Sequence, residues 1–312
     1  MIRSSLLRCA LGALILNAFP VHAAPPDDSK LPALGARVAL GDHRLHLYCT
    51  GQGGPTVVLD AGLGGTSLDW QRVQPQVARF TRVCSYDRPG YGWSERGPFA
   101  PRTTDWLVAQ LDLLLSRGGV EPPYVLTGHS FGGLIAQLYA MRHPLRTAGL
   151  VLVDSTHAGQ FERFAAAGLA RPLVPRGNRQ FVIGNHYRIP DALPEHLKHV
   201  ARALALAPDS VRTLYSELRQ LQPNALLVQQ LGLRLPPVPL QVLAHDSLAR
   251  ARDPRARRLA EIWLALQREL AASVPGGRLR IVPDSGHYIQ LEQPGPVIEA
   301  VREVVETARN RS

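Results

Sequence analysis

The clearest chemical pattern in the sequence is the stretch GHSFGG at residues 128–133. A short apolar run, Tyr124–Gly128, precedes the serine, and a helical pattern begins at Phe131. In a Gly-x-Ser-x-Gly pattern the serine is raised on a sharp turn between a strand and a helix, where larger neighbours would collide. A hydroxyl held in that way is suited to nucleophilic attack. We therefore predict that Ser130 is a catalytic nucleophile.

A serine hydroxyl is a weak nucleophile unless a base takes its proton. Of the 11 histidines, His287 stands out because it follows the apolar run Leu279–Val282 in the stretch PDSGH and precedes a helical pattern. We expect that loop at the same edge of a sheet as Ser130. His129 is adjacent to the nucleophile but should point off the turn in another direction. His287 is the predicted base.

The base needs a carboxylate that fixes its tautomer and stabilises the imidazolium. Asp154 ends the run LVLVD, and Asp246 follows the run LQVLA one strand later. Both fit the chain order Ser, Asp, His that is found in serine hydrolases with a strand–turn–helix nucleophile. Asp253 and Asp284 are weaker candidates, since the first precedes Pro254 as a turn or cap residue would. The residues by themselves leave Asp154 and Asp246 open.

A glycine-rich loop, DAGLGG at 60–65, follows the run TVVLD. A loop in that place supplies a backbone N–H to an oxyanion hole, so we expect the N–H groups of Leu63 and Phe131 to act together. A phosphate-binding role is excluded, because neither the G-x-G-x-x-G nor the GK[ST] spacing is present.

Short strand patterns alternate with amphipathic helical patterns along most of the chain, which predicts an α/β fold with a mostly parallel sheet covered by helices on both faces. An antiparallel pair should lie at one edge. The predicted strands are Ala36–Leu40, Arg44–Cys49, Thr56–Asp60, Arg82–Tyr86, Tyr124–Gly128, Leu150–Asp154, Leu240–Ala244 and Leu279–Val282. The predicted helices are Trp70–Arg79, Thr103–Arg117, Phe131–Arg142, Arg255–Ala272 and Pro296–Ala308.

The alternation stops between Asp154 and Pro236. Helical pieces at Glu195–Leu206 and Asp209–Leu221, separated by prolines such as Pro223, replace the strands there. An insertion at the carboxyl ends of sheet strands lies over the region where such sheets bind ligands. We therefore predict a core formed by residues 24–156 and 237–312 and a helical lid formed by residues 157–236.

Residues 1–23 have the pattern of a secretory signal peptide. Arg3 and Arg8 precede an apolar stretch at 9–19, and small residues permit cleavage after Ala23. The apolar stretch is too short for a membrane-spanning helix, and no later stretch qualifies. The expected location is the periplasm or the medium.

The composition limits the possible partners. With 45% hydrophobic residues in 312, the chain is not disordered. The net charge is +10, yet every basic residue except Lys30 and Lys198 is arginine, which is typical of composition rather than of a nucleic-acid surface. Three cysteines show no zinc spacing, so no metal or cofactor is predicted. The sequence does not indicate an oligomeric state.

These motifs together resemble the α/β-hydrolase superfamily, specifically its lid-bearing members. The resemblance covers roughly residues 35–308 and rests on LDAGLGG at 59–65, SYDRPGYGWS at 85–94, GHSFGG at 128–133 and DSGHYIQLEQP at 284–294. It implies an eight-stranded sheet with a lid inserted after the sixth strand. It also implies that Ser130 is the nucleophile, that His287 is the base, and that Leu63 and Phe131 donate to the oxyanion. Residues 86–94 would shape the sheet edge and the pocket floor.

The resemblance also bears on the acid and on the cysteines. Most relatives carry a Gly-x-Asp loop after the strand that corresponds to 240–244, whereas this chain has Ala244 and His245 before Asp246. A minority, including pancreatic-type lipases, places the acid one strand earlier, so Asp154 is preferred and Asp246 is the alternative. The strands that contain Cys49 and Cys84 would be neighbours, which permits a disulfide bond or two free thiols.

The predicted function is that of an exported serine hydrolase that cleaves small carboxylic esters. Amide, lactone or carbon–carbon bond hydrolysis would use the same triad. A non-catalytic binding protein on the same scaffold is a further alternative. Dehalogenases and epoxide hydrolases of this fold need a nucleophilic aspartate, and Ser130 argues against both.

Overall fold

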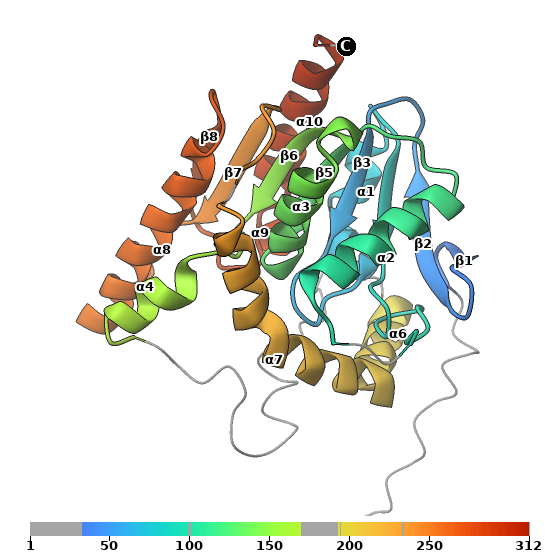
Figure 1. Cartoon of the computed structure of the whole chain (residues 1–312), viewed down its shortest axis with the longest axis horizontal. Helices are drawn as coiled ribbons and strands as arrows, with labels where there is room; N and C mark the ends of the chain where they lie inside the picture. Colours follow the sequence, from blue (N-terminus) through green and yellow to red (C-terminus); the bar gives the residue numbers. More distant parts are fainter. Residues whose placement is uncertain (1–32, 99–100, 170–192, 194, 233, 312) are drawn as a thin grey trace, which may run out of the picture.

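The computed structural model describes residues 33–98, 101–169, 193, 195–232 and 234–311. Eight strands form one sheet in the order β1-β2-β4-β3-β5-β6-β7-β8 (Figure 1). β1 and β2 pair antiparallel at one edge, β2 pairs antiparallel with β4, and all later pairs are parallel. The predicted fold class is therefore confirmed. The strands are β1 (Ala36–Ala39), β2 (Arg44–Thr50), β3 (Thr56–Asp60), β4 (Val83–Tyr86), β5 (Tyr124–His129), β6 (Thr147–Val153), β7 (Leu240–His245) and β8 (Arg278–Val282).

Helices cover both faces of the sheet because alternate strand residues point to opposite sides. Val58, Leu126 and Leu152 pack in a cluster with α2 (Thr104–Arg117), α3 (Phe131–Arg142) and α8 (Pro254–Ala272). Their strand neighbours form a second cluster with α1 (Gln74–Val77), α9 (Ile289–Glu292) and α10 (Pro294–Arg309) on the other side. Figure 1 shows α2 and α3 in front of the sheet and α10 behind it. The two clusters hold the strands in register.

One predicted helix is shorter than expected. In place of a helix over Trp70–Arg79, the chain forms a 3-10 turn, η2 (Ser67–Trp70), and then α1. Pro75 contributes to the break, since it has no N–H to donate to the carbonyl of Gln71, as a continuous helix over Trp70–Arg79 would require. Pro75 is tolerated in the first turn of α1, where an N–H would have no helical partner.

Among the residues that the structure describes between β6 and β7, the helices are α4 (Gln160–Ala166), α6 (Glu195–Leu206) and α7 (Pro208–Gln230). The expectation that α7 ends near Leu221 is wrong, because the helix continues through Pro223. Side-chain contacts fix α7 to the core on both sides of that proline, at Glu217 and at Asn224. Tertiary contacts therefore outweigh the local cost of the proline.

The predicted leader, residues 1–23, lies outside the described residues. Among the helices that the structure describes, none has the length and hydropathy that crossing a bilayer requires.

Candidate active site

Ser130 lies at the turn between β5 and α3 in a backbone conformation that side chains rarely adopt. Its φ is 51° and its ψ is −116°. A side chain at Gly128 would collide with the carbonyl of Gly132, and one at Gly133 would collide with Ser155. The glycines therefore let β5 and α3 approach closely enough to form the bend, and the strain remains at the residue that carries the hydroxyl.

The bend is fixed by backbone hydrogen bonds to the end of β6. The N–H of Ser130 donates to the carbonyl of Val153 at 3.0 Å, and the N–H of Thr156 donates to the carbonyl of Ser130 at 3.0 Å. The residues between these two partners include Asp154. The predicted nucleophile and the predicted acid thus belong to one hydrogen-bonded backbone unit.

Asp154 is fully buried and contacts two imidazoles. Its Oδ2 lies 2.6 Å from Nδ1 of His287 and 2.7 Å from Nδ1 of His245. Its Oδ1 accepts hydrogen bonds from Nε1 of Trp263 at 3.0 Å and from the N–H of His245 at 3.2 Å. Burial alone would raise the pKa of Asp154, but the hydrogen bonds from His245 and His287 hold it well below its ordinary value. The carboxylate is therefore ionised and bound to the predicted base.

Asp246 does not contact His287. Its Oδ1 accepts a hydrogen bond from the N–H of Ala249 at 3.0 Å, as in a turn that leads toward α8. Of the two candidate acids, the geometry brings Asp154 to the imidazole and leaves Asp246 in its own turn.

His287 lies against His129, the residue next to the predicted nucleophile. Its ring centroid is 4.7 Å from that of His129, and Nε2 of His129 lies 2.9 Å from the carbonyl oxygen of His287. Burial, together with the charge of His287, lowers the pKa of His129 to about 3, so this imidazole is neutral at ordinary pH. The structure shows no hydrogen bond between the side chains of Ser130 and His287, two residues that it describes. In unliganded enzymes such bonds are often long and shorten only with substrate bound.

The glycine-rich loop after β3 lies beside Ser130. A Cβ built on Gly62 would be 3.3 Å from the Cβ of Ser130, so the loop backbone passes directly next to Ser130. Gly65 donates to the carbonyl of Gly62 at 3.0 Å and closes the turn that contains Leu63. Phe131 is fully buried at the first position of α3, where the backbone N–H has no helical partner. Both expected oxyanion donors are therefore on segments next to Ser130.

Two residues of this site were missed by the sequence reasoning, His245 and Trp263. β7 lies between β6 and β8 in the sheet, so His245 at its end lies between Asp154 and the loop of His287. The stretch LAHD at 243–246 places a histidine at the end of the predicted strand and could have indicated His245, but only Asp246 was considered there. Trp263, on α8, gave no local signal.

Asp154, His245 and His287 also have the donor types of a metal site, with ligand atoms within 4.8 Å of one another. Both imidazole Nδ1 atoms, however, lie at hydrogen-bonding distance from the same carboxylate oxygen. The arrangement is that of an oriented acid–base pair with a second imidazole.

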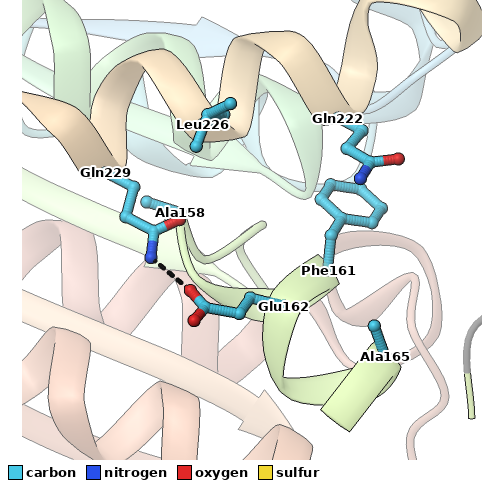
Figure 2. Close-up of a pocket in the computed structure, with 7 residues that line it drawn as sticks. All are labelled: Ala158, Phe161, Glu162, Ala165, Gln222, Leu226 and Gln229. Carbon is cyan, nitrogen blue, oxygen red and sulfur yellow. Dashed lines mark hydrogen bonds between the residues drawn. The ribbon is translucent and has the colours of Figure 1, made fainter. Parts of the chain in front are cut away.

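A cavity of about 310 Å³, whose lining does not include Ser130, Asp154 or His287, lies between α4 and α7 (Figure 2). Gln229 donates to Oε2 of Glu162 at 2.7 Å across it. The cavity is lined by Ala158, Phe161, Glu162, Ala165, Gln222, Leu226 and Gln229.

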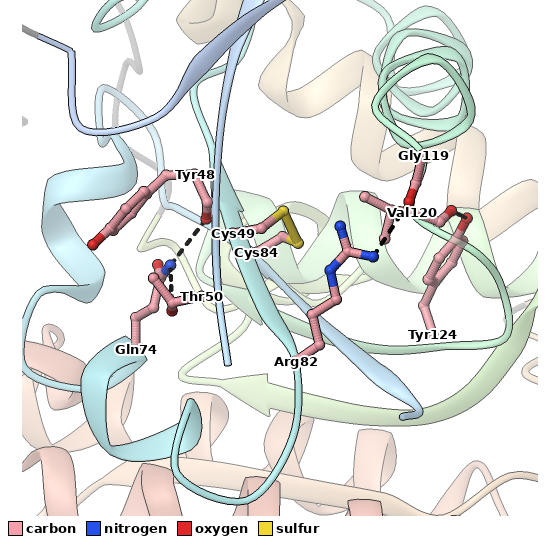
Figure 3. The surroundings of a disulfide bond; sticks show 9 residues. All are labelled: Tyr48, Cys49, Thr50, Gln74, Arg82, Cys84, Gly119, Val120 and Tyr124. Atoms are coloured by element: carbon pink, nitrogen blue, oxygen red, sulfur yellow. Dashed lines mark hydrogen bonds between the residues drawn. A yellow bond between two sulfur atoms is a disulfide. The ribbon is translucent and has the colours of Figure 1, made fainter. Parts of the chain in front are cut away.

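Cys49 on β2 and Cys84 on β4 are directly opposite in the antiparallel pair and form a disulfide bond (Figure 3). Their Cα atoms are 4.0 Å apart. The bond joins the antiparallel edge of the sheet to its parallel part.

Comparisons with known proteins agree with this fold. The sequence profile described as "Alpha/beta hydrolase family" matches residues 57–300. The Bacillus subtilis protein YqjL is 36% identical over 104 residues, which span 33% of this chain and 41% of that relative. The 2-hydroxy-6-oxo-2,4-heptadienoate hydrolase of Pseudomonas putida is 26% identical over 279 residues and spans 86% of this chain and 95% of that protein. The crystal structure of a putative lipase from Acinetobacter baumannii superposes with a TM-score of 0.66 at 19% identity and covers 89% of this chain and 92% of that one.

Proposed function

The chain belongs to the alpha/beta hydrolase family, and from that membership we propose that it is a serine hydrolase that cleaves small carboxylic esters. The observation that supports this most directly is the 2.6 Å contact between Asp154 and His287, next to a serine held at φ 51°. Among the residues that the structure describes, Ser130 is the only serine with a positive φ. Ser130, His287 and Asp154 are the proposed triad.

In the proposed reaction, Oγ of Ser130 attacks the acyl carbon of the ester while Nε2 of His287 takes the hydroxyl proton. Asp154 holds the Nδ1–H of His287 and stabilises the imidazolium. The N–H groups of Leu63 and Phe131 bind the oxyanion of the tetrahedral intermediate. The intermediate collapses to an acyl-serine, and the alcohol leaves with the proton from His287.

The second half of the reaction repeats these roles with water. His287 takes a proton from water, which attacks the acyl-serine, and the oxyanion forms again at the same N–H groups. Collapse releases the carboxylic acid and returns the proton to Oγ of Ser130. No cofactor takes part in this scheme.

We also propose that residues 157–236 act as a cap over this edge of the sheet and that the protein is exported. The signal-like pattern of residues 1–23 supports export, as does the Cys49–Cys84 bond, because disulfides persist in oxidising compartments.

The test is reaction of the purified protein with a fluorescent fluorophosphonate, paired with hydrolysis of p-nitrophenyl esters of increasing acyl length. We expect stoichiometric labelling that Ser130→Ala abolishes and ester turnover that falls with it. A folded protein that neither labels nor hydrolyses any ester would contradict the proposal and favour a binding role.

Carbon–carbon bond hydrolysis is the second candidate, because the Pseudomonas putida relative that matches along nearly its whole length is a 2-hydroxy-6-oxo-2,4-heptadienoate hydrolase. A 2-hydroxy-6-oxo-dienoate added to the same panel separates the two. Faster turnover of that compound than of every ester would favour the second candidate.

A further inference from the structure

A buried ionic cluster joins the helix α7 to the loop that carries the predicted oxyanion donor. Its charged members are Asp60, Arg88, Arg102 and Glu217, each at most 5% exposed. Glu217 comes from α7, between β6 and β7, whereas Arg88 follows β4 and Asp60 ends β3. Two guanidinium groups thus balance two carboxylates in the interior.

Arg88 is at the centre of this cluster, and all five of its side-chain N–H groups are used. Nε donates to Oε1 of Glu217 and Nη2 donates to Oε2 of Glu217, each at 3.2 Å. Nη1 donates to Oδ1 of Asp60 at 2.8 Å and to the carbonyl of Ala61 at 2.6 Å. The second Nη2 bond goes to the carbonyl of Gly62 at 2.8 Å. A lysine has three donors on one atom and cannot reproduce this set.

The bond to Gly62 fixes the direction of an N–H group. The carbonyl of Gly62 and the N–H of Leu63 belong to one planar, trans peptide unit, so they point in opposite directions. When Arg88 holds the carbonyl on one side of the loop, the N–H of Leu63 is turned to the other side. The guanidinium carbon of Arg88 also lies 5.5 Å from the ring centroid of Phe131, the residue of the second predicted donor.

Glu217 keeps Arg88 in this position. It accepts hydrogen bonds from Arg88, from Arg102 at 3.0 Å and from the hydroxyl of Tyr91 at 3.0 Å. Burial alone would raise the pKa of Glu217, but the charges of Arg88 and Arg102 outweigh it and lower the pKa. Without this carboxylate, Arg88 would have one counter-ion, Asp60, and three of its five bonds.

We propose that Glu217 is a positioning residue for oxyanion stabilisation: through Arg88 it orients the Gly62–Leu63 peptide, so that α7 is a fixed support of the active site. This inference rests on the proposed serine-hydrolase function. It assigns a role to Arg88, which lies in the segment 86–94 that was expected to shape the sheet edge and the pocket floor.

The test compares Glu217→Gln with Asn224→Ala, a matched change on the same helix. Asn224 is also buried and ties α7 to the core, since it accepts from the N–H of Thr104 at 2.9 Å and donates to the carbonyl of Arg102 at 3.0 Å. It does not contact Arg88. The measurements are kcat per fluorophosphonate-titrated active site, KM, melting temperature and the Ki of an alkylboronic acid, whose tetrahedral serine adduct places an oxygen in the oxyanion hole.

We expect Glu217→Gln to lower kcat by at least about tenfold, because loss of a whole oxyanion donor costs on the order of 100-fold or more and here a donor is misdirected. The boronate Ki should rise by a similar factor while KM changes little. Asn224→Ala should lower the melting temperature. It should leave kcat per active site and Ki within about twofold, because the hydrogen bond from Arg88 to the carbonyl of Gly62 remains.

If Glu217→Gln does not fold, the double variant Glu217→Gln/Arg102→Gln replaces it. The double variant removes one negative and one positive charge, so the remaining pair of Asp60 and Arg88 stays balanced. It should show the same loss of kcat and of boronate affinity. Unchanged kcat and Ki in either Glu217 variant, or equal losses in Asn224→Ala, would overturn the inference alone. A wild-type protein without labelling or turnover would refute the proposed function and the inference with it.

Discussion

The Oδ2 atom of Asp154 lies 2.6 Å from Nδ1 of His287, although 133 positions separate the two residues in the sequence. Asp154 follows β6 and His287 follows β8, so the loop of His287 reaches across the end of β7. His245, at the end of that middle strand, contacts the same oxygen at 2.7 Å. The carboxylate is therefore shared between the proposed base and a second imidazole that the reaction does not require.

This contact leads to a prediction about the two candidate acids. Asp154→Asn should lower kcat for an activated ester by about 10³–10⁴, because an amide cannot hold the imidazole tautomer or stabilise the imidazolium. Asp246→Asn should change kcat by less than about threefold, since the Asp246 carboxylate accepts its hydrogen bond from Ala249 in its own turn and does not contact His287. Steady-state kinetics of the two purified variants provide the check. A larger loss in Asp246→Asn would reverse the assignment.

The strained backbone at residue 130 predicts opposite effects on stability and activity. Ser130→Ala should lower ester turnover by several orders of magnitude and leave the melting curve nearly unchanged. Ser130→Gly should be equally inactive yet more stable than Ser130→Ala by about 1 kcal/mol, since glycine adopts φ 51° without strain. Urea unfolding of the two variants measures the difference. Equal stabilities would show that the bend is unstrained.

Much of the fold and part of the site followed from local sequence patterns. The run Thr56–Asp60 has the same bounds in the sequence and in the structure, because β-branched residues in a fully buried strand leave a continuous apolar signal. The serine turn was recognisable because the glycines that it needs for steric reasons all lie within the six residues 128–133.

What the sequence did not reveal depends on contacts between distant residues. The bond between Arg88 and Glu217 spans 129 positions, and neither residue lies in a pattern that indicates burial as an ion pair. The second imidazole on Asp154 and the passage of α7 through Pro223 are of the same kind, because both depend on what packs against the element. Periodicity reports which face is buried and carries no information about the partner.

A buried carboxyl beside the glycine-rich loop predicts a dependence of stability on pH. Asp69 is 5% exposed, and burial raises its pKa to about 7, with the charge of Asp87 acting in the same direction. In the unfolded chain this carboxyl ionises near pH 4, so between about pH 4 and 7 the folded state binds more protons. The stability from Asp69 is therefore complete below about pH 4 and is lost as the pH rises through 7.

Asp69→Asn removes this titration. Between pH 5 and 8, the wild type should lose about 2–3 kcal/mol of unfolding free energy relative to the variant, at about 1.4 kcal/mol per pKa unit. Urea unfolding at both pH values gives the result, and Asp105→Asn, at a half-exposed carboxylate that pairs with Arg142, is the control. A difference that is independent of pH would show that Asp69 titrates normally.

The disulfide between Cys49 and Cys84 predicts a stability effect that depends on reduction. Replacing both cysteines by serine should destabilise the protein by about 3–4 kcal/mol, as expected for a cross-link that closes a loop of this size. Treating the wild type with a reductant should lower its melting temperature to about that of the double serine variant.

A thiol count gives an independent check on the same bond. Because Cys9 falls within the expected leader, protein that starts at residue 24 should show no thiol before reduction and two afterwards. Two thiols in the unreduced, unfolded protein would contradict the bond.

The hydrogen bonds from Ser130 to Val153 and from Thr156 to Ser130 have a consequence for local unfolding. The bend at Ser130 cannot relax by itself, because relaxation requires the end of β6 to detach, and that movement also displaces Asp154. Amide hydrogens at 130 and 156 should therefore exchange with solvent at the same rate and through one opening event. Ser130 and Asp154 would therefore lose and regain their native positions in the same event, and a state with only one of them in place would not be populated.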